Sequence, residues 1–202
     1  HGPPDPVLDT GRYKLEALEG SGEKALVRMV SPVDLQTGVQ ISRQFTIGQG
    51  SSRVYLDLTF ANTLDKPIQW SIWDVVQLRA EQRTPSGKTT FDPNCYVTAP
   101  LNMNSRFPRG FNIMFGDDDN PQWQIDEQNG LFKGQYLWEI GKVGIDSPGG
   151  WIAFSQATEG YAFVERFSHE ESGHYPDDGA TVECWTVGAG QVANLDYSAT
   201  EI

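Results

Sequence analysis

The stretch that decides the fold lies at residues 138–183, which read WEIGKVGIDSPGGWIAF (138–154), SQATEGYAFVERFS (155–168) and HEESGHYPDDGATVE (169–183). Apolar and polar residues alternate over 151–154 and 161–167, and this period of two predicts half-buried β-strands. Turn-rich loops containing Gly, Pro, Asp and Ser separate these strands. The stretch therefore predicts antiparallel β-structure, and its last loop carries the strongest candidate site.

Similar segments recur in both directions along the chain. Further strands are predicted at residues 25–30, 39–47, 52–62, 67–79, 110–115, 122–126, 131–136, 138–143 and 191–202. Turn signals recur about every 8–12 residues, a spacing typical of an antiparallel β-sandwich. No segment has a convincing helical period. We predict an all-β fold in one sandwich domain, 1–202, with residues 1–12 as an extended lead-in.

Composition limits the classes of partner. The 202 residues carry a net charge of −12, which disfavours binding to the phosphates of nucleic acid. No apolar run approaches the roughly 20 residues that span a bilayer, so we expect no membrane partner. An acidic, soluble surface is compatible with neutral ligands such as sugars.

The two cysteines, Cys95 and Cys184, are too few for a zinc site of the paired-cysteine type. They form either one disulfide between distant strands or two buried free thiols. We favour the disulfide, because no thiol-redox motif is present. A disulfide favours an extracellular or periplasmic location.

Several motifs together resemble a known family. These are PPDPVLD, TGVQISRQFTI, LTFANTLDKPIQWSIWDVVQL, WEIGKVGIDSPGGWIAF, FVERF and YPDDGATVE. In this set and order the chain resembles the DUF4380 group, proteins of uncharacterised function with the galactose-mutarotase-like supersandwich fold. The resemblance implies a large antiparallel β-sandwich whose concave face holds sugars in related families, in which a His and a Glu act as acid and base. The chain starts at His1, after the early strands of that family, and ends in a strand without a closing turn. We therefore expect a sandwich truncated at both ends.

Candidate catalytic groups gather in and after the strand at 161–167. Glu165, His169 and His174 are the residue types that accept and donate protons during the ring opening or epimerisation of a sugar. Glu165 and Arg166 are adjacent, so they face opposite sides of the sheet. The alternative interpretation is that HEESGH is an ordinary solvated loop.

Aromatic and basic residues are candidates for substrate binding. Trp rings stack on the flat apolar faces of sugars, and we select Trp73 and Trp151. Lys142 and Arg166 could contact acidic sugars. The alternatives are ordinary core packing for the Trp residues and a solvent-facing side chain for the Lys.

Metal sites are weakly indicated. The acidic turn at residues 117–119 offers hard oxygens that suit calcium, but its spacing differs from that of an EF-hand. His1, with His169 or His174, could form a copper brace if its amine is free. The simpler interpretation is that the acidic turn is solvated and that the protein binds no cofactor.

We therefore expect a carbohydrate-binding β-sandwich, with epimerase- or lyase-like acid–base chemistry as its enzymatic form. The alternative is a structural or assembly module that associates with itself through exposed strand edges. A copper histidine-brace oxidase acting through His1 is a third, distant option.

Overall fold

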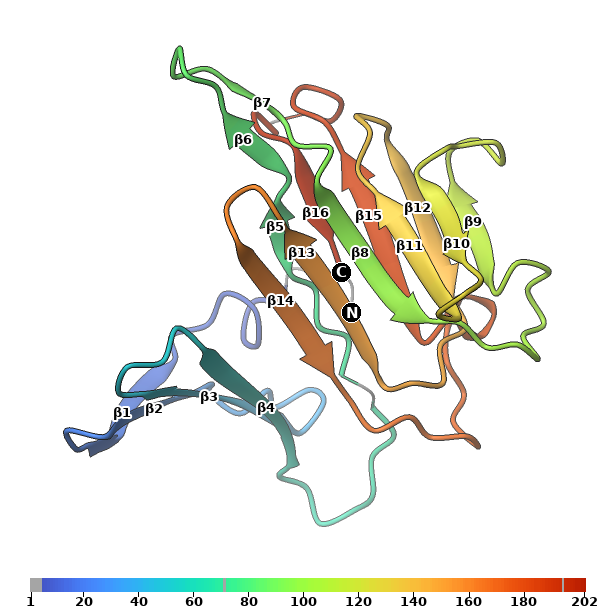
Figure 1. Ribbon diagram of the computed structural model, residues 1–202. Coiled ribbons are helices and arrows are strands. Elements are labelled where there is room, and N and C mark those ends of the chain that lie inside the picture. Colours follow the sequence, from blue (N-terminus) through green and yellow to red (C-terminus); the bar gives the residue numbers. More distant parts are fainter. Residues whose placement is uncertain (1–4, 71, 194) are drawn as a thin grey trace. The chain divides into compact units, whose positions relative to one another are not determined.

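The computed structural model describes residues 5–70, 72–193 and 195–202. Within these ranges the protein is all-β, with no α-helix and a single 3-10 turn at Asp177–Gly179 (Figure 1). The chain divides into two compact units, His1–Trp73 and Asp74–Ile202. The expectation of one domain stays a prediction.

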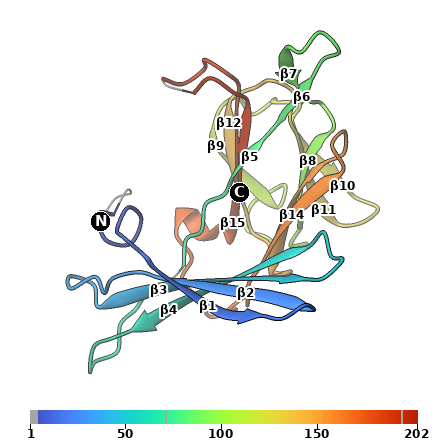
Figure 2. The same ribbon diagram turned by 90° about the vertical axis from the view of Figure 1, so that its left-hand side faces the viewer.

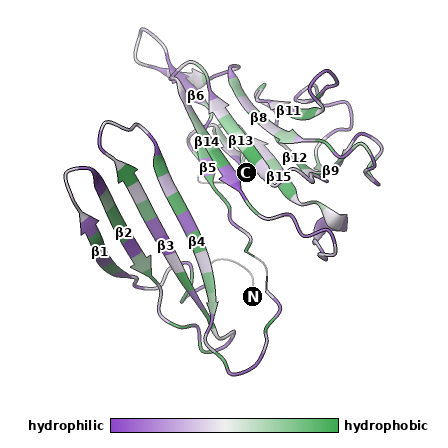
Figure 3. Ribbon diagram, turned by 60° about the horizontal axis from the view of Figure 1, so that its bottom comes forward, coloured by the Kyte–Doolittle hydropathy of each residue, from purple (hydrophilic) through white to green (hydrophobic). Residues whose placement is uncertain are grey.

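The first unit is a four-stranded antiparallel sheet in which each strand pairs with its sequence neighbours. Its strands are β1 (Lys14–Gly20), β2 (Lys24–Val30), β3 (Val39–Gly48) and β4 (Val54–Asn62). The register aligns the apolar residues of successive strands, so Phe45 faces Leu56 and Ile41 faces Phe60. Alternation along each strand therefore gives the sheet one apolar face, visible as repeated hydrophobic bands on its strands (Figure 3).

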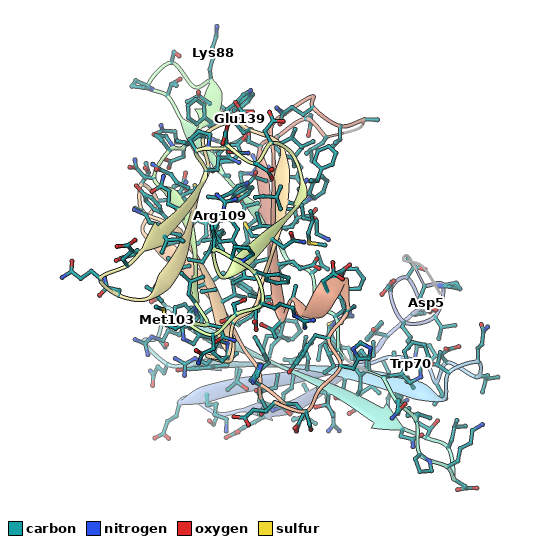
Figure 4. The ribbon with its side chains drawn as sticks, turned by 90° about the vertical axis from the view of Figure 1, so that its right-hand side faces the viewer. Asp5, Trp70, Lys88, Met103, Arg109 and Glu139 are labelled. Atoms are coloured by element: carbon teal, nitrogen blue, oxygen red, sulfur yellow. The ribbon has the colours of Figure 1, made fainter. Side chains whose placement is uncertain are left out.

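The second unit contains two five-stranded antiparallel sheets. The β8 sheet has the order β10 (Trp123–Asp126), β11 (Leu131–Gln135), β8 (Cys95–Pro100), β13 (Trp151–Gln156) and β14 (Tyr161–Arg166). The β15 sheet has the order β5 (Gln77–Arg79), β16 (Ala199–Glu201), β15 (Val182–Val187), β12 (Gly141–Ile145) and β9 (Phe111–Phe115). A hairpin of β6 (Glu81–Arg83) and β7 (Thr89–Phe91) projects from this unit, with Lys88 near its tip (Figure 4).

The two sheets pack face to face as separate layers (Figure 2). Strand alternation directs Val97 and Phe154 of the β8 sheet, and Val143 and Ile145 of the β15 sheet, into one shared core, where all four are buried. Phe132 lies in the same core and packs edge-on against Phe111 of the other sheet, with ring centroids 5.3 Å apart. The predicted antiparallel β-sandwich is confirmed.

A buried glutamine links separate segments of this sandwich through hydrogen bonds. The side chain of Gln122 donates from Nε2 to Thr186 Oγ1 at 2.8 Å and to the Glu139 carbonyl at 3.1 Å. Its Oε1 accepts from the backbone N–H groups of Leu137 at 2.8 Å and Glu139 at 3.0 Å. One side chain therefore ties the segment before β12 to β15 and satisfies backbone groups that no ladder reaches.

The prediction of a disulfide between Cys95 and Cys184 is wrong. Cys95 begins a strand of the β8 sheet and Cys184 lies in the β15 sheet, and both are buried free thiols. Each belongs to the inward face of its own strand and packs as a small apolar side chain. The predicted extracellular or periplasmic location depended on that bond and stays a prediction without it.

Two segments depart from the strand predictions. Among the described residues of 67–79, only Gln77–Arg79 forms a strand, and Val76 extends it through two backbone hydrogen bonds with Ile202. In the opposite direction, residues 92–108 contain no predicted strand, yet they include β8, the central strand of its sheet. Its alternation of buried Cys95, Val97 and Ala99 spans only six residues and ends in a proline.

Candidate functional site

The most distinctive polar group lies on the outer face of the β15 sheet. Register pairs Lys142 with Trp185 and Gly144 with Glu183, while Val143 and Cys184 point inward. Lys142, Glu183 and Trp185 therefore share the outward face. Lys142 Nζ lies 2.6 Å from Glu183 Oε2, and both side chains are largely shielded from solvent.

The Tyr-Pro-Asp-Asp-Gly turn holds a second carboxyl against this pair. Asp177, Asp178 and Gly179 have φ angles of 52°, 58° and 90°, in the left-handed region that favours glycine. Aspartate tolerates this region better than most residues, but two in succession still cost conformational free energy. The Asp177 side chain hydrogen bonds with that of Glu183. The strained turn thus places two carboxyl groups in contact.

The electrostatics of the two carboxyl groups are linked. Burial raises the pKa of Glu183, and the hydrogen bond with Asp177 and the charge of Asp177 raise this pKa further. Lys142 acts in the opposite direction, but the net shift in the pKa of Glu183 is upward. A raised pKa favours the protonated form of Glu183, and a protonated carboxyl beside a second carboxyl is an arrangement used in acid–base chemistry.

A cavity of about 240 Å³ adjoins the turn. Its lining residues are Arg106, His174, Tyr175, Pro176, Asp177, Asp178 and Gly179. The Arg106 guanidinium packs so closely on Gly179 that a Cβ there would lie 1.6 Å from the Arg106 Nη2. We call the group of Lys142, Glu183, Trp185, Asp177, His174 and Arg106 the Asp177 corner. Two residues expected from the sequence, Lys142 and His174, both lie in it.

His169 borders this corner through an aromatic neighbour. Its ring stacks on Tyr175, with centroids 5.6 Å apart and planes 10° apart. The Tyr175 hydroxyl accepts a hydrogen bond from the Glu170 backbone N–H at 2.9 Å. The loop that follows β14 is therefore folded back on itself, so His169 supports Tyr175 in the lining of the cavity.

Glu165 lies elsewhere. It pairs with Ile152 across β13 and β14 and so faces the interior of the sandwich, opposite to Arg166. Burial raises the pKa of Glu165 to about 7, with a smaller contribution from the negative charge of Asp74. Its Oε1 is buried without a hydrogen-bond partner among the described residues. The charged group that acts on Glu165 is thus another carboxylate, and the catalytic role expected for Glu165 stays a prediction.

The predicted binding residues divide between two places. Trp151 and Arg166 are cross-strand partners on the outer face of the β8 sheet. Trp73 is 66% exposed and lies outside any strand, at the end of the first unit. No single groove is lined by Trp123, Trp151 and Trp185, because Trp123 is buried in the core while the other two face outward from different sheets.

Four members of the Asp177 corner were not selected from the sequence: Arg106, Asp177, Glu183 and Trp185. A signal was present for two of them, since the alternation in VECWTV places Glu183 and Trp185 on the face opposite Cys184. Asp177 is one of two adjacent acids in a turn, a pattern typical of a solvated loop. Nothing local indicates Arg106, which reaches the turn only through the tertiary fold.

The part of the chain that the structure describes contains no cluster of metal-binding side chains. No group of three or more His, Cys, Asp or Glu side chains in residues 5–70, 72–193 and 195–202 is arranged to hold a metal ion. The acidic turn at 117–119 is exposed. His1, the residue on which the copper brace depended, lies outside the described residues.

Comparison with known proteins adds no relative. No family model, curated protein or solved structure matches this chain. The resemblance to the DUF4380 group stays a prediction. The described residues form no helix with the length and apolar character needed to cross a membrane.

Proposed function

We propose that this chain binds carbohydrate at the Asp177 corner and that the Asp177–Glu183 carboxyl pair supplies acid–base chemistry to the bound sugar. The observation that supports this most is the contact of the two carboxyl groups, held by a turn with two aspartates in the left-handed region. Strained backbone of this kind persists where the surrounding structure holds it, and it gathers at functional sites.

The chemistry follows from a protonated carboxyl beside a second carboxyl. Ring opening or epimerisation of a sugar requires one group that donates a proton and another that accepts one. In the pair, the protonated carboxyl donates and the ionised carboxylate accepts. Lys142 provides a positive charge 2.6 Å from Glu183, which stabilises the ionised form of this residue during each transfer. His174, whose imidazole can both accept and donate a proton, lines the adjoining cavity.

Binding follows from the neighbours of the pair. Trp185 shares the outward face with Lys142 and Glu183 and presents an aromatic surface to the apolar side of a sugar ring. Carboxylates, an ammonium group and a guanidinium group accept from and donate to the sugar hydroxyls. A cavity of about 240 Å³ is smaller than the usual ligand pocket of roughly 300–1,000 Å³, so we expect it to hold one sugar unit.

The proposal is tested by titrating tryptophan fluorescence with a panel of neutral and acidic mono- and oligosaccharides. We expect saturable quenching by one class of sugar in the wild-type protein and its loss in Trp185→Phe. Trp151→Phe is the matched control, because it removes a Trp from the outer face of the other sheet. If quenching is lost in Trp151→Phe instead, the sugar binds beside Arg166 and the Asp177 corner is not the site. A folded protein that responds to no sugar contradicts carbohydrate binding.

The chemical part is tested separately with any sugar that binds. NMR exchange spectroscopy follows interconversion of its anomers or epimers in the presence of protein. Asp177→Asn should abolish the added exchange while leaving binding within a few-fold, whereas Asp117→Asn, in the exposed acidic turn, should leave both unchanged. Binding without any catalysed exchange in the wild-type protein would identify a lectin-like module rather than an enzyme.

A further inference from the structure

The first unit ends in an unusual edge strand. β4 contains nine residues, VYLDLTFAN, and Asp57 is its only charged residue. It pairs with β3 on one side, and no described residue forms a ladder with its other side. Val54 and Tyr55 are 61% and 56% exposed. A long, apolar edge of this kind is a template for another strand.

The opposite edge of the same sheet is protected. β1 carries Lys14, Glu16 and Glu19, with Lys14 and Glu16 paired at 2.9 Å. Its pairing with β2 is interrupted by an irregularity between Ala17 and Glu19. Charges and bulges are the devices that prevent strands from adding to an edge. The β4 edge of this sheet has a regular register without a bulge and carries a single charged residue, Asp57.

The apolar face of the sheet continues to this edge. Val54, Leu56, Leu58 and Phe60 align with Ile47, Phe45, Arg43 and Ile41 of β3 in the same order. The face extends to Ala25, Val27 and Met29 of β2. Within this face Arg43 is charged and Ile41 is buried, so the exposed apolar residues lie at one end of it, at Ile47, Val54 and Leu56. Exposed apolar surface beside an unpaired edge marks an interaction site.

We propose that β4 pairs antiparallel with β4 of a second copy of this chain, about a two-fold axis at Leu58, so that the two sheets become one. This inference rests on the first unit alone and is independent of the proposed carbohydrate site. Residue 58 is the midpoint of Val54–Asn62, so this is the register that pairs the whole strand with itself.

The side chains of β4 are complementary to themselves in this register. Leu58 faces its own counterpart, Leu56 faces Phe60, and Asp57 faces Thr59, so apolar residues meet apolar residues and no like charges are opposed. A slip that centres the pairing on Asp57 would bring two carboxylates together. A slip by one residue would place the apolar face of one copy against the polar face of the other. The register centred on Leu58 avoids both penalties and is the one that pairs the whole strand with a second copy.

A pair of variants at one position tests this register. In the dimer, residue 59 of each copy faces Asp57 of the other copy. Thr59→Asp therefore creates two pairs of repelling carboxylates, whereas Thr59→Lys creates two attractive ion pairs. We expect Thr59→Asp to raise the dimer dissociation constant by roughly 2- to 30-fold and Thr59→Lys to lower it, as measured by sedimentation velocity over a concentration series. A structural effect of replacing Thr59 would move both variants in the same direction.

Cross-linking gives a second measurement. Leu58→Cys should form an intermolecular disulfide under mild oxidation, because directly opposed residues have Cβ atoms within about 4.5–5.5 Å. Leu35→Cys, at a residue that is 91% exposed in a turn, is the control and should remain monomeric on a non-reducing gel. A protein that stays monomeric throughout, or a dimer insensitive to both Thr59 variants and not cross-linked at position 58, would overturn the proposal.

Discussion

Lys142 Nζ lies 2.6 Å from Glu183 Oε2 on the outer face of the β15 sheet, where Glu183 also contacts Asp177. The ammonium group opposes the two influences that raise the pKa of Glu183, namely burial and the neighbouring carboxyl. The balance among these influences sets the pKa of Glu183. A substitution at position 142 should therefore change the pKa of Glu183.

Lys142→Met should raise the pKa of Glu183 further, because it removes the one neighbour that stabilises the ionised carboxylate. An NMR titration of the side-chain carboxyl carbon of Glu183 measures this. Lys133→Met is the control, since Lys133 lies over the Tyr96 ring in the other sheet. An unchanged titration of Glu183 in the Lys142 variant would show that the ion pair does not form in solution.

Glu165→Gln should make stability less dependent on pH. The pKa of Glu165 is raised from 4.5 to about 7 in the folded protein, so folding favours its protonated form. Ionisation therefore imposes no cost below about pH 4.5 and a growing cost as the pH rises towards 7. With allowance for partial exposure, we expect the variant to gain about 1–2 kcal/mol at about pH 8 and nothing at about pH 4. Urea unfolding at the two pH values measures this, with exposed Glu127→Gln as the control; an equal gain at both values would contradict it.

Gly179→Ala should disturb the cavity. A Cβ at this position would meet the Arg106 guanidinium, and the backbone has a φ of 90°. Gly190→Ala is a matched control, because Gly190 also has a positive φ, 76°, but open space at the Cβ position. Both variants should lose about 1–2 kcal/mol in thermal unfolding from backbone strain. Only Gly179→Ala should also weaken sugar binding. If both variants bind sugar equally well, Arg106 is not part of the binding site.

Gln122→Leu should destabilise the second unit by about 2–5 kcal/mol, because it leaves the backbone N–H groups of Leu137 and Glu139 without an acceptor. Gln124→Leu is the control two residues away, where the side chain is only partly buried. Denaturant unfolding compares the two. Similar losses in both variants would mean that the hydrogen bonds of Gln122 contribute little.

The two thiols should be unreactive in the native protein. Burial raises the pKa of Cys95 to about 12 and also raises the pKa of Cys184, so neither forms the nucleophilic thiolate at neutral pH. Titration with a chromogenic disulfide reagent should detect no thiol before denaturation and two afterwards. Rapid reaction of the folded protein would show that the sandwich opens readily.

Local alternation explains which strands could be predicted. The period of two along 151–154, 161–167 and 52–62 is a property of the sequence, and all three segments are strands in the structure. Residues 67–70 and 72–75 have equally suitable side chains but form no strand, because strand formation also requires a neighbouring edge. β8 has such neighbours on both sides and forms a strand from a short pattern that ends in a proline.

The sequence by itself determined that this protein is an antiparallel β-sandwich, that Glu165 and Arg166 face opposite ways, and that the chain is acidic. These are consequences of composition and of alternation within one strand. Only the tertiary structure decided that Lys142, Glu183 and Asp177 meet, that Cys95 and Cys184 stay apart in different sheets, and that Glu165 has Asp74 as its charged neighbour. Such contacts join residues far apart along the chain, so they depend on which strands pair and which face each sheet buries. No local pattern encodes that choice.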